Sequence, residues 1–465
     1  MTHPQPPQLA SRSSASSRGD RLALVVLCLA QAMLVLDVTV VNVALPVMSR
    51  ELGLPEGLAG WAVAAYAVTF GGLLLLGGRL ADVFGTKRML PAGLAVFTVA
   101  SLAAGLASSA EWFLAARAVQ GVGAALLSPA ALAVLLHRFD GAARHRALAV
   151  WGAVGGGGAA VGVLLGGLLA GGPGWRWIFF INVPVGVLVA IAIVVFGVAV
   201  PVARRRERVD VAGALLATAG VGSLIAALSA STSDEGALAA GLAALGAALL
   251  AAFVAAERRV SQPLVRLELV RSRPVATGSL LMLVATGLLV GGLFMLSFEL
   301  QVGSGWSPIE TGLAFLPISV AIVAGAHVAG RAVGRVGARI VGSLALLVAA
   351  IGLGTTAAAT SIVGAEFLAI AGMTVAALGL GAAFVCASTT ALSGVDGTEA
   401  GAASGVLNSF HELGSAVGVA ALGAIAATSI GVGFQLAAVV AVVAAVVTAL
   451  AVASGVPRAG AHFVH

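Results

Sequence analysis

Long apolar segments follow one another along almost the whole of this 465-residue chain, and the short loops between them carry most of its charge. Each segment runs for about 18 to 25 residues, the length that an α-helix needs to cross a hydrocarbon layer of about 30 Å. Membrane-spanning β-strands need only about ten residues, so a β-barrel does not fit. With 60% hydrophobic and 9% charged residues, the composition is also far from that of a soluble domain. The sequence therefore predicts an all-α integral membrane protein.

The pattern predicts fourteen transmembrane helices, with ends set to within a few residues. An even number of crossings places both ends of the chain on the same side of the membrane. The expected spans are 22–45, 58–78, 89–108, 112–136, 147–170, 177–199, 211–231, 237–256, 276–300, 309–330, 340–360, 363–390, 402–426 and 431–454.

Basic residues gather in alternate loops. With these spans, all but three of the 25 Lys and Arg residues fall on one side of the membrane. Arg50 and Arg176 lie on the opposite side, and Arg117 lies inside a span. Cationic loops stay in the cytoplasm, so we expect a multi-pass plasma membrane protein with both termini cytoplasmic. The short acidic loop 393–400 takes the same side from its neighbours.

The composition excludes several other classes of protein. A net charge of +6 with a pI near 10.8 can indicate nucleic-acid binding, but here the arginines are spread over separate loops, where membrane lipid headgroups are the expected partners. No nucleotide-binding loop, catalytic triad or metal-ligand cluster is visible, so we expect neither an enzyme nor a cofactor. Any transport would then draw on an ion gradient.

Two similar loops, 78–88 and 330–339, lie 252 residues apart, which predicts two homologous halves. The first loop can bridge neighbouring helix ends as a conformational latch, whereas the second has Gly334 in place of the acidic residue. The predicted latch residues are Gly78, Arg79, Asp82, Gly85, Lys87 and Arg88.

Polar side chains inside spans indicate where function lies, because burying a charge at that depth costs at least a few kcal/mol. Asp37 in the first span can hold a proton in one conformation and release it when water enters in another. Arg117 in the fourth span, with Gln120 one turn away, needs an anion, a carbonyl group or water. The alternatives are a capped polar group near the outer surface for Asp37 and a purely structural helix contact for Arg117. Asn42 is a further candidate cavity residue.

Glycines in the fifth span recur on one face of the helix, where they suit close helix packing or a gate surface. They are Gly158, Gly162 and Gly166, followed by Gly167.

Three later groups are candidates for lining a cavity or binding substrate. Glu299 stands at the outer end of the ninth span, where a solvated position is the alternative. His411 and Glu412 are adjacent in the thirteenth span and point about 100° apart on a helix, so they need not touch each other.

Taken together, these motifs resemble the fourteen-helix drug:proton antiporter family of the major facilitator superfamily. One difference is Val163 after Gly162, where the family motif has proline, and another is the His411-Glu412 pair, where basic or amide residues are more common. The matching segments are 37–46, 78–88, 117–129, 162–167 and 175–184, with weaker matches at 305–308 and 401–418.

The resemblance implies a major facilitator fold of two six-helix bundles with two inserted helices, working by alternating access. Separately, we expect the chain to function as a monomer. It implies Asp37 and Arg117 as proton-coupling residues, and proton-driven efflux of small hydrophobic and often cationic compounds. A dedicated exporter of one endogenous metabolite and a membrane sensor or scaffold are the alternatives. The expected divisions are a cytoplasmic tail 1–20, a bundle 21–200, an insertion 201–260, a second bundle 261–456 and a tail 457–465.

Overall fold

The structure is a computed structural model that describes residues 18–54, 58–198, 209–231, 236–260, 263–264, 266–396 and 399–452. Most of the predicted N-terminal tail, the whole predicted C-terminal tail and the arginines at 204–206 and 208 lie outside the described residues. Within the described ranges the chain forms fourteen helices that are long and apolar enough to cross a membrane, which confirms the predicted number.

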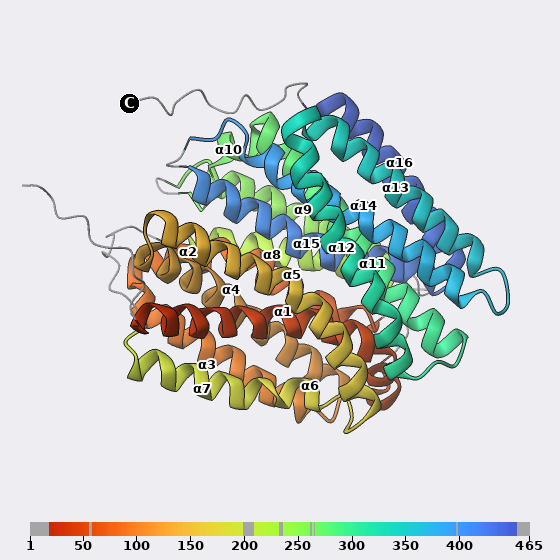
Figure 1. Cartoon of the computed structure of the whole chain (residues 1–465), viewed down its shortest axis with the longest axis horizontal. Helices are drawn as coiled ribbons and strands as arrows, with labels where there is room; N and C mark the ends of the chain where they lie inside the picture. The colour runs from red at the N-terminus through yellow and green to blue at the C-terminus, as the bar shows by residue number, and fades with distance from the viewer. Residues whose placement is uncertain are drawn as a thin grey trace, which may run out of the picture.

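The helices follow one another with short connections (Figure 1). They are α1 (Arg18–Leu52), α2 (Trp61–Phe84), α3 (Thr86–Gly105), α4 (Ala110–Arg138), α5 (Gly141–Gly171), α6 (Trp177–Phe180), α7 (Asn182–Val195), α8 (Val211–Ala230), α9 (Gly236–Glu257), α10 (Leu267–Arg271), α11 (Arg273–Phe298) with the π-helical turn η2 (Glu299–Gly303), α12 (Pro308–Val336), α13 (Ala338–Ala359), α14 (Glu366–Leu392), α15 (Ala400–Ala426) and α16 (Ile430–Ala451).

Two helices differ from the expected spans. The first helix continues past Pro46 to Leu52, because a transmembrane helix tolerates proline when neighbouring groups satisfy the freed carbonyl. The carbonyl freed by Pro46 is that of Asn42, one turn earlier in the helix. The sixth span consists of two pieces, α6 and α7, which share one apolar stretch.

Helices α1 to α7 form the N-terminal half, in which α4 packs between α2 and α3, and α1 packs along α5. Small residues set these contacts: a side chain on Gly77 or Gly93 would meet the backbone of α4. Close packing of this kind is the main attraction between helices in lipid, where no hydrophobic force drives them together.

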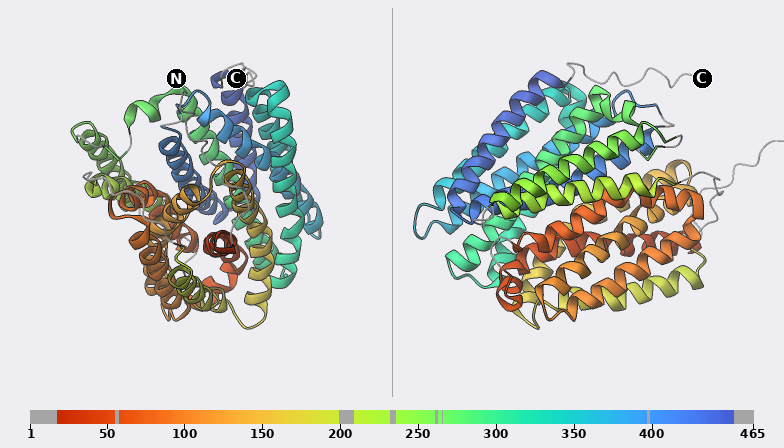
Figure 2. Two further views of the ribbon diagram at one scale, coloured as in Figure 1. Left: turned by 60° about the vertical axis from the view of Figure 1, so that its left-hand side comes forward. Right: turned by 180° about the vertical axis from the view of Figure 1, so that it is seen from behind.

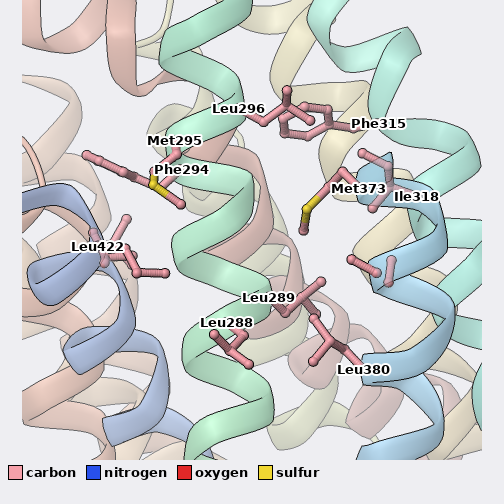
Figure 3. Close-up of a cluster of buried hydrophobic side chains, with 14 of the residues drawn as sticks. Leu288, Leu289, Phe294, Met295, Leu296, Phe315, Ile318, Met373, Leu380 and Leu422 are labelled. Atoms are coloured by element: carbon pink, nitrogen blue, oxygen red, sulfur yellow. The ribbon is translucent and has the colours of Figure 1, made fainter. Parts of the chain in front are cut away.

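Helices α11 to α16 form the C-terminal half around α11 and α14. Figure 3 shows apolar side chains of α11, such as Leu289 and Met295, facing Met373 and Leu380 of α14 and Leu422 of α15. These side chains are almost fully buried. The half is therefore a packed bundle with its own apolar centre.

The two similar loops of the sequence, 78–88 and 330–339, also have similar backbone conformations. Gly85 after α2 and Gly337 after α12 share φ of 85°, with ψ of 145° and 153°. No atom lies within 4 Å of a Cβ added at Gly85, so the backbone angle alone requires glycine there. The two loops are structural equivalents, as the 252-residue spacing predicts.

The inserted helix α8 lies on both halves. It packs against α2 and α15, and Trp61 of α2 donates from Nε1 to Ser229 Oγ at 3.0 Å. Helix α9 packs on α8 and is mostly exposed. The insertion thus covers the seam between α2 and α15.

We call the side where α1 begins and α16 ends the terminal side, and the opposite side the far side. On the far side the halves touch, because Gly167 of α5 packs against Pro308 and Gly312 of α12. Towards the terminal side, Gly157 of α5 and Gly330 of α12 have no atom within 4 Å of an added Cβ. Figures 1 and 2 show the same relation: the helices of the C-terminal half run obliquely to those of the N-terminal half. Along α5 and α12, the halves are thus in close contact at the far side, whereas these two glycines are open towards the terminal side.

Candidate functional site

Asp37 and Arg117 form an ion pair in the interior of the N-terminal half. Arg117 Nη1 lies 2.5 Å from Asp37 Oδ2, and the two residues are 1% and 2% exposed. Helix α1 brings the acid and α4 the base. The two charges singled out in the sequence therefore compensate each other, which is the condition for keeping either one buried.

Two side-chain amides also donate to Asp37, and the Ser101 hydroxyl accepts from both of them. Gln120 Nε2 donates to Asp37 Oδ1 at 2.7 Å and to Ser101 Oγ at 2.8 Å, and its Oε1 accepts from Arg117 Nη1 at 2.7 Å. Asn182 Nδ2 donates to Asp37 Oδ1 at 3.3 Å. Ser101 lies on α3 and Asn182 begins α7, so the network joins four helices.

Arg117 is also held by groups that do not depend on Asp37. Its Nε donates to the Ala62 carbonyl of α2 at 2.9 Å. Its guanidinium carbon lies 4.6 Å from the centre of the Tyr66 ring and 5.7 Å from that of Phe179. Cation–π contacts strengthen when they are desolvated, so Arg117 has a defined place even if Asp37 loses its charge.

The glycine face of α5 positions α1 next to this pair. Gly158 packs against Val35, and Gly162 packs against Thr39, so these contacts lie on either side of Asp37 along α1. Gly166 reaches the α1 backbone at Val40. The neighbouring Gly167 faces α12 instead, so one helix touches both the network and the seam between the halves.

Two predicted candidates lie outside the network. Asn42 is buried on α1, and its Nδ2 donates to the Val38 carbonyl of its own helix at 3.0 Å. Glu299 opens the π-helical turn at the far side and is half-buried. Neither touches Asp37 or Arg117 in the described contacts.

His411 and Glu412 face different helices, as their spacing predicts. His411 Nδ1 lies 2.9 Å from Thr286 Oγ1 of α11, within the C-terminal half. Glu412 faces α2 of the other half, where a Cβ on Gly71 would lie 2.7 Å from Glu412 Cβ. It is half-buried and makes neither a hydrogen bond nor an ion pair within the described residues. Among the described residues, Glu412 thus has no counterion, and it lies at the contact between the halves.

The predicted latch lies at the terminal side, around the end of α2. Gly78 approaches Pro129 of α4 at ordinary contact distance, and Arg79 Nη2 donates to the Pro263 carbonyl at 3.4 Å. Asp82, Lys87 and Arg88 are exposed. A role for these groups in switching stays a prediction.

The sequence reading did not identify Tyr66, Ser101, Asn182 or Phe179 as parts of the site. Asn182 and Phe179 belong to a segment whose motif was recognised but given no role. Ser101 offers no signal, because a serine in an apolar helix is commonly satisfied by its own backbone, as its bond to the Phe97 carbonyl at 2.8 Å illustrates.

The geometry defines the class of this protein. Two repeated bundles pack together along α2 with α15 and along α5 with α12, and a compensated ion pair ties the helices of one bundle together. This is the architecture of a solute transporter and not of an enzyme.

The chain belongs to the Major Facilitator Superfamily, whose family model matches residues 27–419. A puromycin resistance protein of Streptomyces alboniger is 39% identical over 408 residues, which cover 86% of this chain and 80% of the relative. A cephamycin export protein of Amycolatopsis lactamdurans is 37% identical over 409 residues, covering 86% and 84%. A methyl viologen resistance protein of Salmonella typhimurium is 33% identical over 424 residues, covering 89% and 84%.

Solved structures agree on the fold. A D-xylose–proton symporter superposes with a TM-score of 0.68 at 14% identity, covering 93% of this chain and 98% of the symporter. A bacterial homologue of the human lysosomal transporter Spinster gives a TM-score of 0.65 at 14% identity, covering 94% and 96%. At such identities the likeness concerns the fold alone.

Proposed function

We propose that this protein exports small hydrophobic molecules, including cationic drugs or antibiotics, across the plasma membrane in exchange for protons. The observation that carries the proposal is the buried Asp37–Arg117 pair, because protonation of such a carboxylate removes the attraction that ties α1 to α4. The relatives support the direction of transport, since they are named for resistance or export. The proton gradient supplies the energy, so transport needs no cofactor. One copy of the chain, in contact with membrane lipids, carries out the transport.

Positively charged loops argue for cytoplasmic termini, so the terminal side, where Gly157 and Gly330 are open, would face the cytoplasm. In this state the transporter is ready to take up a substrate from inside the cell. A proton reaching Asp37 loosens α1, which packs on the glycine face of α5, and α5 contacts α12 through Gly167. The change at Asp37 can thus reach the seam that must open on the far side.

Export from proteoliposomes tests the proposal. A fluorescent lipophilic cation is loaded, a pH gradient is imposed, and export by the native chain is compared with that by Asp37→Asn. We expect gradient-driven export by the native chain and a loss of about tenfold or more in the variant, because the amide cannot exchange a proton. Asp140→Asn is the matched control, since its carboxylate is exposed and pairs with Arg144 at the surface.

Gradient-driven export that survives in Asp37→Asn would remove Asp37 from proton coupling. A narrower function is the second candidate, since individual relatives are named for one compound, puromycin or cephamycin. A dedicated exporter of one metabolite would ignore the fluorescent cation but respond to a single member of a panel of hydrophobic compounds.

A further inference from the structure

Gln301 is a buried amide that joins the two halves at the far side. It lies in the π-helical turn η2 at the end of α11 and is 5% exposed. Its Nε2 donates to the Val43 carbonyl of α1 at 2.8 Å and to Ser297 Oγ of its own helix at 3.0 Å. The first of these bonds crosses from the C-terminal half to the N-terminal half. Neither the ion-pair network nor the glycine face of α5 accounts for it.

The chemistry of the contact determines which end of the amide faces α1. A carbonyl oxygen can only accept a hydrogen bond, so the amide nitrogen must face Val43. Oε1 of Gln301 then has no hydrogen-bond partner within the described residues. Burying an amide with one unsatisfied end costs free energy, and a methionine would fill a permanent apolar contact without that cost. The amide is better suited to a contact that is broken and remade, because water can bind both of its ends when the helices part.

Apolar side chains surround this hydrogen bond. Val43 of α1 and Leu300 of η2 are both 0% exposed, and they belong to one apolar cluster with members in both halves. Water is therefore kept away from the bond while α1 lies against α11, and a hydrogen bond is stronger in such surroundings than in water. The closed contact is thus a defined link between the halves.

The backbones on both sides of the bond are suited to local movement. On the C-terminal half, Gln301 lies in a π-helical turn, a conformation that is rare and frequent at functional sites. On the N-terminal half, Pro46 leaves the Asn42 carbonyl without its helical donor, and proline is a common cause of helix kinks. Helix α1 can therefore bend close to Val43.

The same helix carries the proposed proton site. Val43 follows Asp37 by six residues, a distance of about 9 Å along a helix. A displacement of α1 that follows protonation of Asp37 would therefore act directly on the Val43 carbonyl and on its bond to Gln301.

We propose that Gln301 is the gating residue of the far side, an inference whose part in export rests on the proposed function. Its bond to the Val43 carbonyl holds α1 against α11 in this state, and the bond breaks when the far side opens. Water then takes the place of each partner, and the return of α1 remakes the bond.

The distance between two spin labels on the far side tests this role without a substrate. In a background without Cys28 and Cys386, labels are attached at Leu106→Cys, after α3, and at Val363→Cys, between α13 and α14. These positions are 58% and 105% exposed and lie in different halves. Double electron–electron resonance distinguishes open molecules by their longer distance. We expect Gln301→Met, which removes the donor and keeps the side-chain length, to raise the ratio of open to closed molecules about threefold or more, the order expected for one hydrogen bond.

Gln435→Met is the matched control, because it makes the same replacement at an exposed position of α16. It should keep the native ratio. Gln301→Asn is the second test variant: it retains the amide but is one methylene shorter, so it cannot keep the bond and should also raise the ratio. A native ratio in either Gln301 variant, including one with no open molecules at all, would overturn the proposal. Monodisperse elution and a native melting temperature show that a variant is folded.

Export measurements separate this inference from the proposed function. If the native chain exports by the gradient and the Gln301 variants keep the native distance ratio, the gate fails and antiport stands. If the native chain exports nothing, the proposed function fails, and the label distances still decide whether Gln301 holds the far side closed.

Discussion

Arg117 binds Asp37, Gln120 and the Ala62 carbonyl at once, so removing it leaves a buried carboxylate without its counterion. Breaking one side of a buried pair costs roughly 3–5 kcal/mol, whereas removing both charges costs much less. We therefore expect Arg117→Gln to lower the melting temperature more than the double variant with Asp37→Asn, as measured by thermal unfolding in detergent; additive losses would show that the pair is not coupled. Both charges were identifiable in the sequence, because a charged residue in an apolar span is rare and needs a binding partner there. Ser101 was not identifiable, since its hydroxyl also bonds its own helix and only the packing of α3 against α4 turns it towards Gln120.

Helix α5 links the ion pair to the seam between the halves, and its glycines are the parts that allow this. A Cβ on Gly166 would lie 2.7 Å from the Val40 carbonyl oxygen of α1, which real side chains do not tolerate, whereas Gly152 on the same helix has no atom within 4 Å. Gly166→Ala should therefore destabilise the protein by about 1–3 kcal/mol and reduce export. Gly152→Ala, the matched control, should be neutral or slightly stabilising because alanine favours helix by about 1 kcal/mol. Thermal unfolding and export of both variants check this, and equal behaviour would contradict the packing. The glycine spacing predicted a close-packed face. It did not reveal that α1 occupies that face beside Asp37, because helix periodicity identifies a face and not its partner.

The whole molecule is closed on the far side in this state, so a covalent link there should trap it. Gly60 at the start of α2 and Val419 of α15 belong to different halves, and a Cβ on Gly60 would lie 3.1 Å from Val419 Cγ1. The two positions are thus in side-chain contact, which is the proximity that a disulfide requires. In a background without Cys28 and Cys386, we expect Gly60→Cys with Val419→Cys to cross-link readily and to lose export, because the far side can no longer open. Reduction should restore transport. The control pair is Gly157→Cys with Gly330→Cys, where no atom lies within 4 Å of either added Cβ, and it should stay reduced under the same mild oxidation. Cross-linking is read as a mobility shift after cleavage at a site introduced between the halves. Full export by the linked far-side pair would mean that transport does not require this side to open, and alternating access would then fail for this protein.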